Sequence, residues 1–226
     1  MPILTGSVRI ILLFICVRRI RTTNLIFARH GQARNNVDRV LAGRAPGFPL
    51  TDEGRRQAAG AARLLAGMGI SAIYCSPIQR ARETAGIMAG VSDITVDGRL
   101  SELEMGSFTG KTYEEISGTH GNVFLRFYEG DPGVGESGVE TFESVRRRVA
   151  EIAREAASRH PGGNVLLVTH MDPIKAMIFE SLHPPPEALF GLVIENASLN
   201  IFRYGEAVEL GAINVMEPGR LAPLNP

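Results

Sequence analysis

The chain has 226 residues, of which 44% are hydrophobic, and its 24 Lys and Arg residues balance its 24 Asp and Glu residues. This length and composition fit one α/β domain and exclude a disordered chain. Zero net charge argues against nucleic acid or a strongly charged membrane surface as partner, so any anion must be bound by a few placed arginines.

The N-terminus carries an apolar run, Ile10–Val17, with a basic cluster after it. The run is much shorter than the roughly 20 residues that a membrane-spanning helix needs, so we expect no stable membrane insertion. A signal peptide would place its basic residues first. We interpret residues 1–21 as a non-essential extension, consistent with a start codon placed too far upstream, and residues 22–226 as the domain. Attachment to a membrane surface is the alternative.

Short apolar runs separated by helical patterns continue along the rest of the chain. This alternation is typical of βαβ units and a mostly parallel sheet covered on both faces. The predicted strands are Leu25–Ala28, Ala72–Cys75, Ile94–Val96, Val165–Thr169 and Leu199–Tyr204. After the last of them, Tyr204-Gly205-Glu206-Ala207 is typical of a Gly-X hairpin turn and predicts an antiparallel edge near the C-terminus.

Capping residues mark several helix starts. Thr51 is a suitable N-cap before two acidic residues. Ser76 and Asp172 are each followed by proline, which predicts helices with these residues as N-caps and the proline at the first helical position. Phe142–Ala157 places Val145, Val149, Ile152 and Ala156 on one helical stripe. We expect its Arg146-Arg147-Arg148 run to lie on the solvated face.

Residues 103–140 do not fit the alternation, since they are rich in Gly, Glu and aromatic residues. We interpret them as a small insertion, or cap, over the carboxyl ends of the strands. Its apolar stretch Val123–Tyr128 is expected either to line the pocket or to form the core of the lid. The predicted fold class is therefore a three-layer α/β/α domain with a mostly parallel sheet.

Polar residues follow the predicted strands at the points where ligands bind to open parallel sheets. Arg29 and His30 follow the first strand, Arg80 lies in the helix after the second, Glu102 follows the third and His170 the fourth. Alone, each has an ordinary structural explanation. Together at one rim they indicate an anion site.

These residue types form a coherent phosphoryl-transfer set. Arginines bind phosphate oxygens bidentately, and a neutral histidine can attack phosphorus. A second histidine can stabilise the spreading charge, and a carboxylic acid can protonate the leaving group and then activate water. This chemistry needs no metal. The two cysteines, Cys16 and Cys75, show no zinc-ligand spacing and no disulfide framework, as expected for a reducing, cytoplasmic location.

Several motifs occur in a fixed order: Arg-His-Gly with an asparagine six residues past the histidine, a glycine and a Pro-Leu-Thr before a helix, a Ser-Pro element, an acidic element with two glycines, and a later histidine. The residues are Arg29-His30-Gly31, Asn36, Gly43, Pro49-Leu50-Thr51, Ser76–Ala85, Leu100, Glu102, Gly106, Gly110 and His170. Over about residues 24–205 this pattern resembles the histidine phosphatase superfamily, which includes the cofactor-dependent phosphoglycerate mutases.

The resemblance implies that His30 is the phosphorylated nucleophile and Glu102 the proton donor, with catalytic support from Arg29, Arg80 and His170. It implies a phosphate pocket, free of metal or other cofactor, for a small phosphorylated substrate. The implied substrate-binding residues are Arg29, Asn36, Gly43, Arg80, His170 and Met171.

Three positions depart from the family pattern. Ala33 stands where the family often has Ser or Thr, Met171 follows His170 where glycine is usual, and Phe108-Thr109 replaces a common Trp-Glu. None of these removes a catalytic group, so the departures bear on the choice of substrate.

The short segment between Glu102 and His170 resembles that of the short-cap phosphatases rather than the mutases. A smaller lid excludes less water, which favours hydrolysis of a reactive intermediate. We therefore expect a phosphomonoesterase, with a 2,3-bisphosphoglycerate-dependent phosphoglycerate mutase as the alternative. A phospho-ligand-binding module without catalysis is a third hypothesis. The sequence does not determine the substrate or the oligomeric state.

Overall fold

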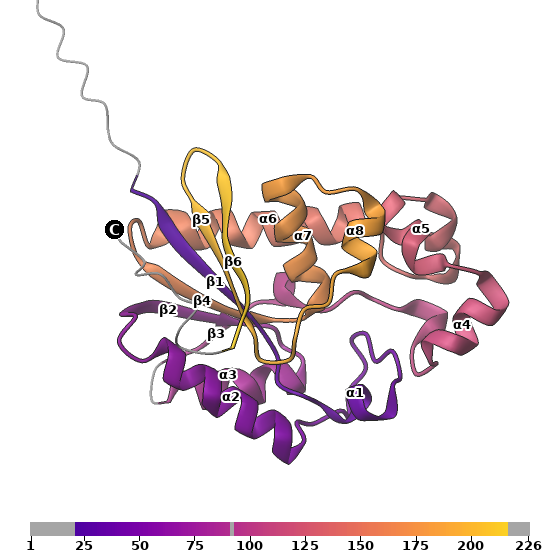
Figure 1. Cartoon of the computed structure of the whole chain (residues 1–226), viewed down its shortest axis with the longest axis horizontal. Coiled ribbons are helices and arrows are strands. Elements are labelled where there is room, and N and C mark those ends of the chain that lie inside the picture. The colour runs from indigo at the N-terminus through magenta and orange to yellow at the C-terminus, as the bar shows by residue number, and fades with distance from the viewer. Residues whose placement is uncertain (1–20, 91–92, 217–226) are drawn as a thin grey trace, which may run out of the picture.

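A six-stranded sheet forms the centre of the computed structural model, which describes residues 21–90 and 93–216 (Figure 1). The strand order is β3-β2-β4-β1-β5-β6. The strands are β1 (Thr23–Arg29), β2 (Ile70–Cys75), β3 (Thr95–Val96), β4 (Asn164–Thr169), β5 (Leu199–Tyr204) and β6 (Val208–Val215).

The strand directions confirm the predicted fold class. β1 pairs in parallel with β4, and β2 pairs in parallel with both β3 and β4. β5 and β6 form the antiparallel edge beside β1. The predicted hairpin is present, but Tyr204 pairs with Val208, so the loop has one residue more than a Gly-X turn. The predicted third strand is shorter than expected and begins at Thr95.

Helices cover both faces of the sheet, with α2 and α3 on one face and α6 and α7 on the other (Figure 1). Side chains of β1 alternate between the two resulting cores, since Leu25 and Phe27 face α6 while Ile26 and Ala28 face α2 and α3. Because both faces are buried, a continuous apolar run is the pattern expected for such a strand.

The helices are α1 (Arg34–Asp38), α2 (Asp52–Leu65), α3 (Gln79–Ala89), α4 (Tyr113–His120), α5 (Val123–Glu129), α6 (Phe142–Arg159), α7 (Met171–Leu182) and α8 (Pro186–Gly191). Thr51 caps α2 as predicted, its hydroxyl accepting from the N–H of Gly54 at 3.0 Å. The predicted stripe of α6 is fully buried.

Two predicted helix starts are wrong. The helix expected to begin with Pro77 begins at Gln79, because the backbone at Ile78 is extended and Ile78 is the N-cap. The Ser76 hydroxyl accepts from the N–H of Ile78 and contacts His170. The helix expected to begin with Pro173 begins two residues earlier, at Met171. The Asp172 carboxylate, expected to cap it, instead accepts from the hydroxyl of Tyr128 at 2.6 Å.

The 103–140 segment contributes α4 and α5, which lie beyond the carboxyl ends of the strands (Figure 1). Its buried Phe127 and Tyr128 pack into the same core as α6. Residues 1–20 of the predicted extension lie outside the described residues, and so does Cys16. No helix in residues 21–90 and 93–216 combines the length and apolar character of a membrane span.

The prediction that Arg146, Arg147 and Arg148 share a solvated face is wrong for two of them. Only Arg147 is exposed. Arg146 lies 4.1 Å above the ring of Phe179, and the Arg148 side chain is only 13% exposed. Position 148 is three residues after Val145, which turns its side chain toward the packed side of α6.

Candidate active site

The carboxyl ends of β1 and β4 bring two histidines together. Arg29, the last residue of β1, pairs with Thr169, the last residue of β4, so His30 and His170 occupy equivalent positions on adjacent strands. Their ring centroids are 5.1 Å apart and both side chains are buried.

Hydrogen bonds fix the tautomer of His30. Its Nε2 lies 3.1 Å from Nε of Arg80, which can only donate, so Nε2 is the acceptor. Its Nδ1 lies 2.7 Å from the carbonyl oxygen of Gly31 and therefore carries the proton. Burial, with the charges of Arg80 and Arg29, holds the pKa of His30 well below its ordinary value. The ring is thus neutral, with its lone pair on Nε2.

Backbone packing holds the turn that carries His30. A Cβ on Gly31 would lie 2.4 Å from the carbonyl oxygen of Gly54 in the first turn of α2, so only glycine fits. The N–H of Gly31 also donates to the hydroxyl of Thr84 in α3 at 3.0 Å. Two helices therefore set the position of the turn.

Arg80 is buried at the start of α3 and is held at both ends of its guanidinium. Besides His30, it contacts the carbonyl oxygen of Gly43 through Nη2 at 2.8 Å. Burial lowers the pKa of Arg80 to about 10, although the charge of Glu102 acts in the opposite direction. Arg29 donates to the carbonyl oxygen of Ile194.

Three buried nitrogens at this edge have no hydrogen-bond partner among the described residues: Nε of Arg29, Nη1 of Arg80 and Nδ1 of His170. Burying a polar group without a partner is costly, so these nitrogens are available to bind a ligand. The two arginines and His30 line a pocket of about 220 Å³. Cationic donors that converge in this way suit an anion with several oxygens.

Glu102 lines the same pocket, and its carboxylate accepts from three backbone N–H groups. The donors are Leu103 at 2.9 Å, Met171 at 3.3 Å and Asp172 at 3.4 Å. The last two are the first N–H groups of α7, so the carboxylate lies at the positive end of that helix. Burial and the nearby charge of Asp172 nevertheless raise the pKa of Glu102 to about 7. Near neutral pH this group can both give and take a proton.

Asp172 is a pocket residue whose part in the site the sequence reasoning missed. It lies beside Glu102 in the lining and is buried. Tyr128, from α5 of the insertion, holds it by the hydroxyl contact described above, and Lys175 lies 4.9 Å from the Tyr128 ring centroid. The insertion therefore reaches the site through Tyr128.

Of the other predicted binding residues, Asn36, Gly43 and Met171 also line the pocket, whereas His170 is not among its lining residues. The Asn36 side-chain oxygen accepts from the N–H of Ala33 at 2.9 Å. Gly43 presents its carbonyl oxygen to Arg80, and the N–H of Met171 points to Glu102. Asn35, which the sequence reasoning missed, lines the pocket as well.

A second, larger cavity has a volume of about 660 Å³. Arg44, which follows Gly43, and Ser101, which precedes Glu102, both line it, as does Arg82. Among the described residues, no group of three or more His, Cys, Asp or Glu side chains is arranged to hold a metal ion.

Comparison with known proteins places these features in a family. Residues 25–210 match the sequence model of the histidine phosphatase superfamily (branch 1). A relative from Thermoplasma acidophilum, a 2,3-bisphosphoglycerate-dependent phosphoglycerate mutase, is 34% identical over 86% of this chain and 95% of its own length.

Two further relatives are phosphatases by name. Phosphoserine phosphatase 1 of Hydrogenobacter thermophilus is 28% identical over 80% of this chain and 87% of its own length. The solved structure of a mycobacterial glucosyl-3-phosphoglycerate phosphatase in complex with VO3 superposes with a TM-score of 0.75 at 27% identity, covering 85% of this chain and 98% of that one.

Proposed function

Because the chain belongs to the histidine phosphatase superfamily (branch 1), we propose that it is a phosphomonoesterase that hydrolyses a small phosphorylated metabolite through a phosphohistidine on His30. The observation that carries the proposal is the state of His30. Its unprotonated Nε2 lies beside Arg80, in a pocket where Arg29 and Arg80 both have unpartnered nitrogens.

The first step transfers the phosphoryl group to the enzyme. Nε of Arg80 gives up its hydrogen bond to Nε2 of His30, and the freed lone pair on Nε2 forms a bond to phosphorus while the bond from phosphorus to the leaving oxygen breaks. Glu102, protonated in part because its pKa is about 7, gives its proton to that oxygen. Arg29, Arg80 and His170 stabilise the negative charge on the phosphoryl oxygens.

The second step returns the enzyme to its starting state. The Glu102 carboxylate takes a proton from water while the water oxygen attacks phosphorus. The N–P bond breaks, its electron pair returns to Nε2 of His30, and phosphate leaves. In both steps Asn36, Gly43 and Met171 act as binding residues of the pocket.

A phosphoglycerate mutase is the second candidate, and the named Thermoplasma relative favours it. The two activities share the phosphohistidine and differ in the acceptor of the phosphoryl group. A mutase needs a bisphosphorylated glycerate primer, whereas a phosphatase gains nothing from it.

The test is acid-quench trapping of the phosphoenzyme in wild type and His30→Ala, with release of phosphate from p-nitrophenyl phosphate and 3-phosphoglycerate measured in parallel. We expect an acid-labile label in the wild type only, and a loss of turnover on the order of 10⁴-fold or more in the variant. Labelling from 2,3-bisphosphoglycerate with little phosphate release would identify the mutase instead. No labelling and no turnover across a panel of monoesters would refute both and leave a binding module.

A further inference from the structure

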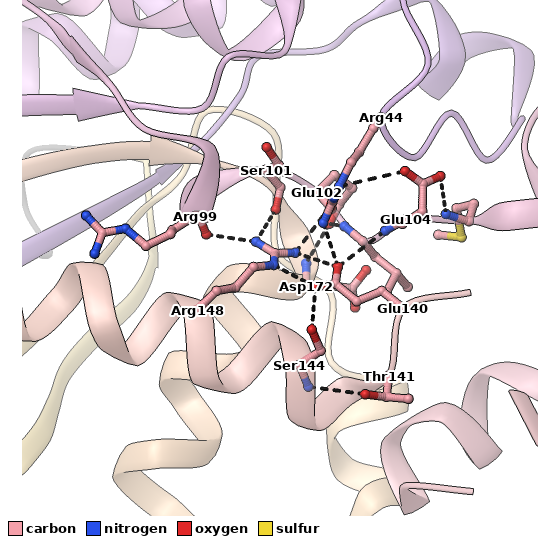
Figure 2. Close-up of polar contacts among 12 residues, drawn as sticks. Arg44, Arg99, Ser101, Glu102, Glu104, Glu140, Thr141, Ser144, Arg148 and Asp172 are labelled. Carbon is pink, nitrogen blue, oxygen red and sulfur yellow. Dashed lines mark hydrogen bonds and ion pairs between the residues drawn. The ribbon is translucent and has the colours of Figure 1, made fainter. Parts of the chain in front are cut away.

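Arg148 of α6 donates hydrogen bonds to the backbone of the segment that carries Glu102 (Figure 2). Its Nη1 donates to the carbonyl oxygens of Arg99 at 2.8 Å and Ser101 at 2.6 Å, and its Nη2 to that of Glu102 at 3.3 Å. Its Nε and Nη2 bind the two carboxylate oxygens of Glu140 at 2.8 and 2.9 Å. These contacts use all five N–H donors of the guanidinium.

Glu140 orients Arg148 and is itself fixed by its neighbours (Figure 2). Its carboxylate also accepts from Nη2 of Arg44 at 2.8 Å and from the hydroxyl of Ser144 at 3.0 Å. Arg44 in turn donates through Nε to the carbonyl oxygen of Glu102 at 2.9 Å. Burial alone would raise the pKa of Glu140, but Arg148 and Arg44 hold it below its ordinary value. The carboxylate therefore stays charged.

A second side chain also binds a carbonyl oxygen of this segment. The hydroxyl of Thr169, the last residue of β4, donates to the carbonyl oxygen of Leu100 at 2.6 Å. Each carbonyl from Arg99 to Glu102 is thus held by a side chain. The segment has no strand partner of its own there, since β3 ends at Val96 and Glu102 follows a short 3₁₀ turn.

We propose that Arg148, oriented by Glu140, is a positioning residue that sets the place of the Glu102 carboxyl relative to the reacting phosphoryl group. The proposal rests on the role of Glu102 in the proposed function. The hydrogen bonds to the Glu102 carboxylate orient the end of its side chain. The hydrogen bonds from Arg148 to the carbonyl oxygens fix the backbone from which that side chain extends. A misplacement of about 1 Å at a reacting group can cost on the order of 100-fold in rate.

A misplaced Glu102 carboxyl should affect alkyl and aryl phosphates differently, whereas a loss of folded protein would lower the activity toward both equally. Alkyl phosphates need a proton on the leaving oxygen, but p-nitrophenolate leaves without one. The kcat/KM, which reports steps through the first phosphoryl transfer, should therefore fall for the alkyl substrate and not for the aryl one. Hydrolysis of the phosphoenzyme also needs Glu102, so the phosphoenzyme should accumulate with p-nitrophenyl phosphate, whose first step is not slowed.

The experiment compares Arg148→Lys with wild type and Glu102→Gln, using an alkyl phosphate and p-nitrophenyl phosphate. Lysine has three donors on a compact ammonium and cannot reproduce the five contacts. We expect kcat/KM for the alkyl phosphate to fall by about 10- to 100-fold, that for p-nitrophenyl phosphate to change by less than about 3-fold, and more phosphoenzyme to be trapped with the latter. Glu102→Gln should show the same pattern more strongly.

Arg146→Lys is the matched control, because Arg146 lies on the same helix, pairs with Glu180 and Glu143, and touches no residue of the pocket. It should behave as wild type. Glu140→Gln, which keeps the shape and removes the charge, decides the question if Arg148→Lys does not fold. Equal losses on both substrates, or none, would overturn the positioning role. Absence of a phosphoenzyme in the wild type would instead refute the proposed function.

Discussion

The ionisation of Glu102 depends on its neighbour Asp172. Burial and the charge of Asp172 raise the pKa of Glu102 to about 7, while burial and two arginines push that of His30 well below 6.5. The proposed first step needs Glu102 protonated and His30 neutral. Activity toward an alkyl phosphate should therefore fall as the pH rises through about 7, and the limb due to His30 should lie on the acid side of 6.5.

Asp172→Asn tests this coupling. Removing the negative charge lowers the pKa of Glu102 toward its ordinary value, so the basic limb of the kcat/KM profile should move to lower pH. The measurement is the profile for one alkyl phosphate in wild type, Asp172→Asn and Glu102→Gln, since the substrate's own ionisation is then common to all three. An unmoved limb in Asp172→Asn would show that Asp172 does not control the acid.

Individual site residues were predictable to different degrees. Arg29, His30 and His170 follow buried strands directly, and the sequence pattern placed them at one rim, where the structure has them. For Arg148, the run of three arginines predicts a position on the solvated face, and this prediction is wrong. The spacing of Arg148 from Val145 and Ile152 places it on the same side of the helix as these apolar residues. This spacing is the signal in the sequence that indicates a packed position. No local sequence pattern predicts that Arg148 binds carbonyl oxygens of a segment distant in the chain.

Two glycines of α2 differ in what surrounds them. A Cβ on Gly54 would lie 2.0 Å from the carbonyl oxygen of Gln32, in the loop after His30, whereas one on Gly60 would meet nothing closer than 3.7 Å. Helix propensity alone favours alanine at both positions. Packing of the loop against the helix therefore decides the outcome at Gly54.

Gly54→Ala should destabilise the protein by about 1–3 kcal/mol through overpacking, while Gly60→Ala should stabilise it by about 0.5–1 kcal/mol. Urea unfolding of the two variants beside wild type measures both effects. Because the displaced backbone adjoins His30, Gly54→Ala should also lower kcat. A Gly54→Ala protein as stable and active as Gly60→Ala would contradict the close approach.

The helix starts show where local sequence rules stop applying. Thr51 caps α2 as its sequence predicts, because its hydroxyl can accept from the N–H of Gly54 while it donates to the Gln32 side chain. Ser76 and Asp172 have the same capping chemistry, but the site uses them, for His170 and Tyr128 respectively. Sequence rules describe what a capping residue can do, and tertiary contacts decide which partner it takes.

At the scale of the whole molecule, the pocket holds two arginines whose side chains suit a bound anion. Among the described residues, Nε of Arg29 and Nη1 of Arg80 are buried without a hydrogen-bond partner. An anion that binds only the folded state should therefore stabilise the whole chain by linkage, by about 2.7 kcal/mol at 100 times its Kd.

Inorganic phosphate should accordingly raise the Tm of wild type by several degrees, given roughly 2–4 °C per kcal/mol for a chain of this size. Arg80→Met should lose most of that shift. Differential scanning fluorimetry with sodium chloride at matched ionic strength separates binding from screening. Equal shifts with both salts, or an undiminished shift in Arg80→Met, would argue against phosphate in this pocket.

The place of β1 in the sheet has a consequence for biosynthesis. Both of its neighbours, β4 and β5, come from the second half of the chain. A ribosome that has made Arg29 and His30 must extend the chain past Thr169 before the first partner strand is complete. Until then the apolar stretch Leu25–Ala28 has open edges and is a target for chaperones or for aggregation. The segment that carries His30, the proposed nucleophile, is therefore made long before its partner strands can pair with it.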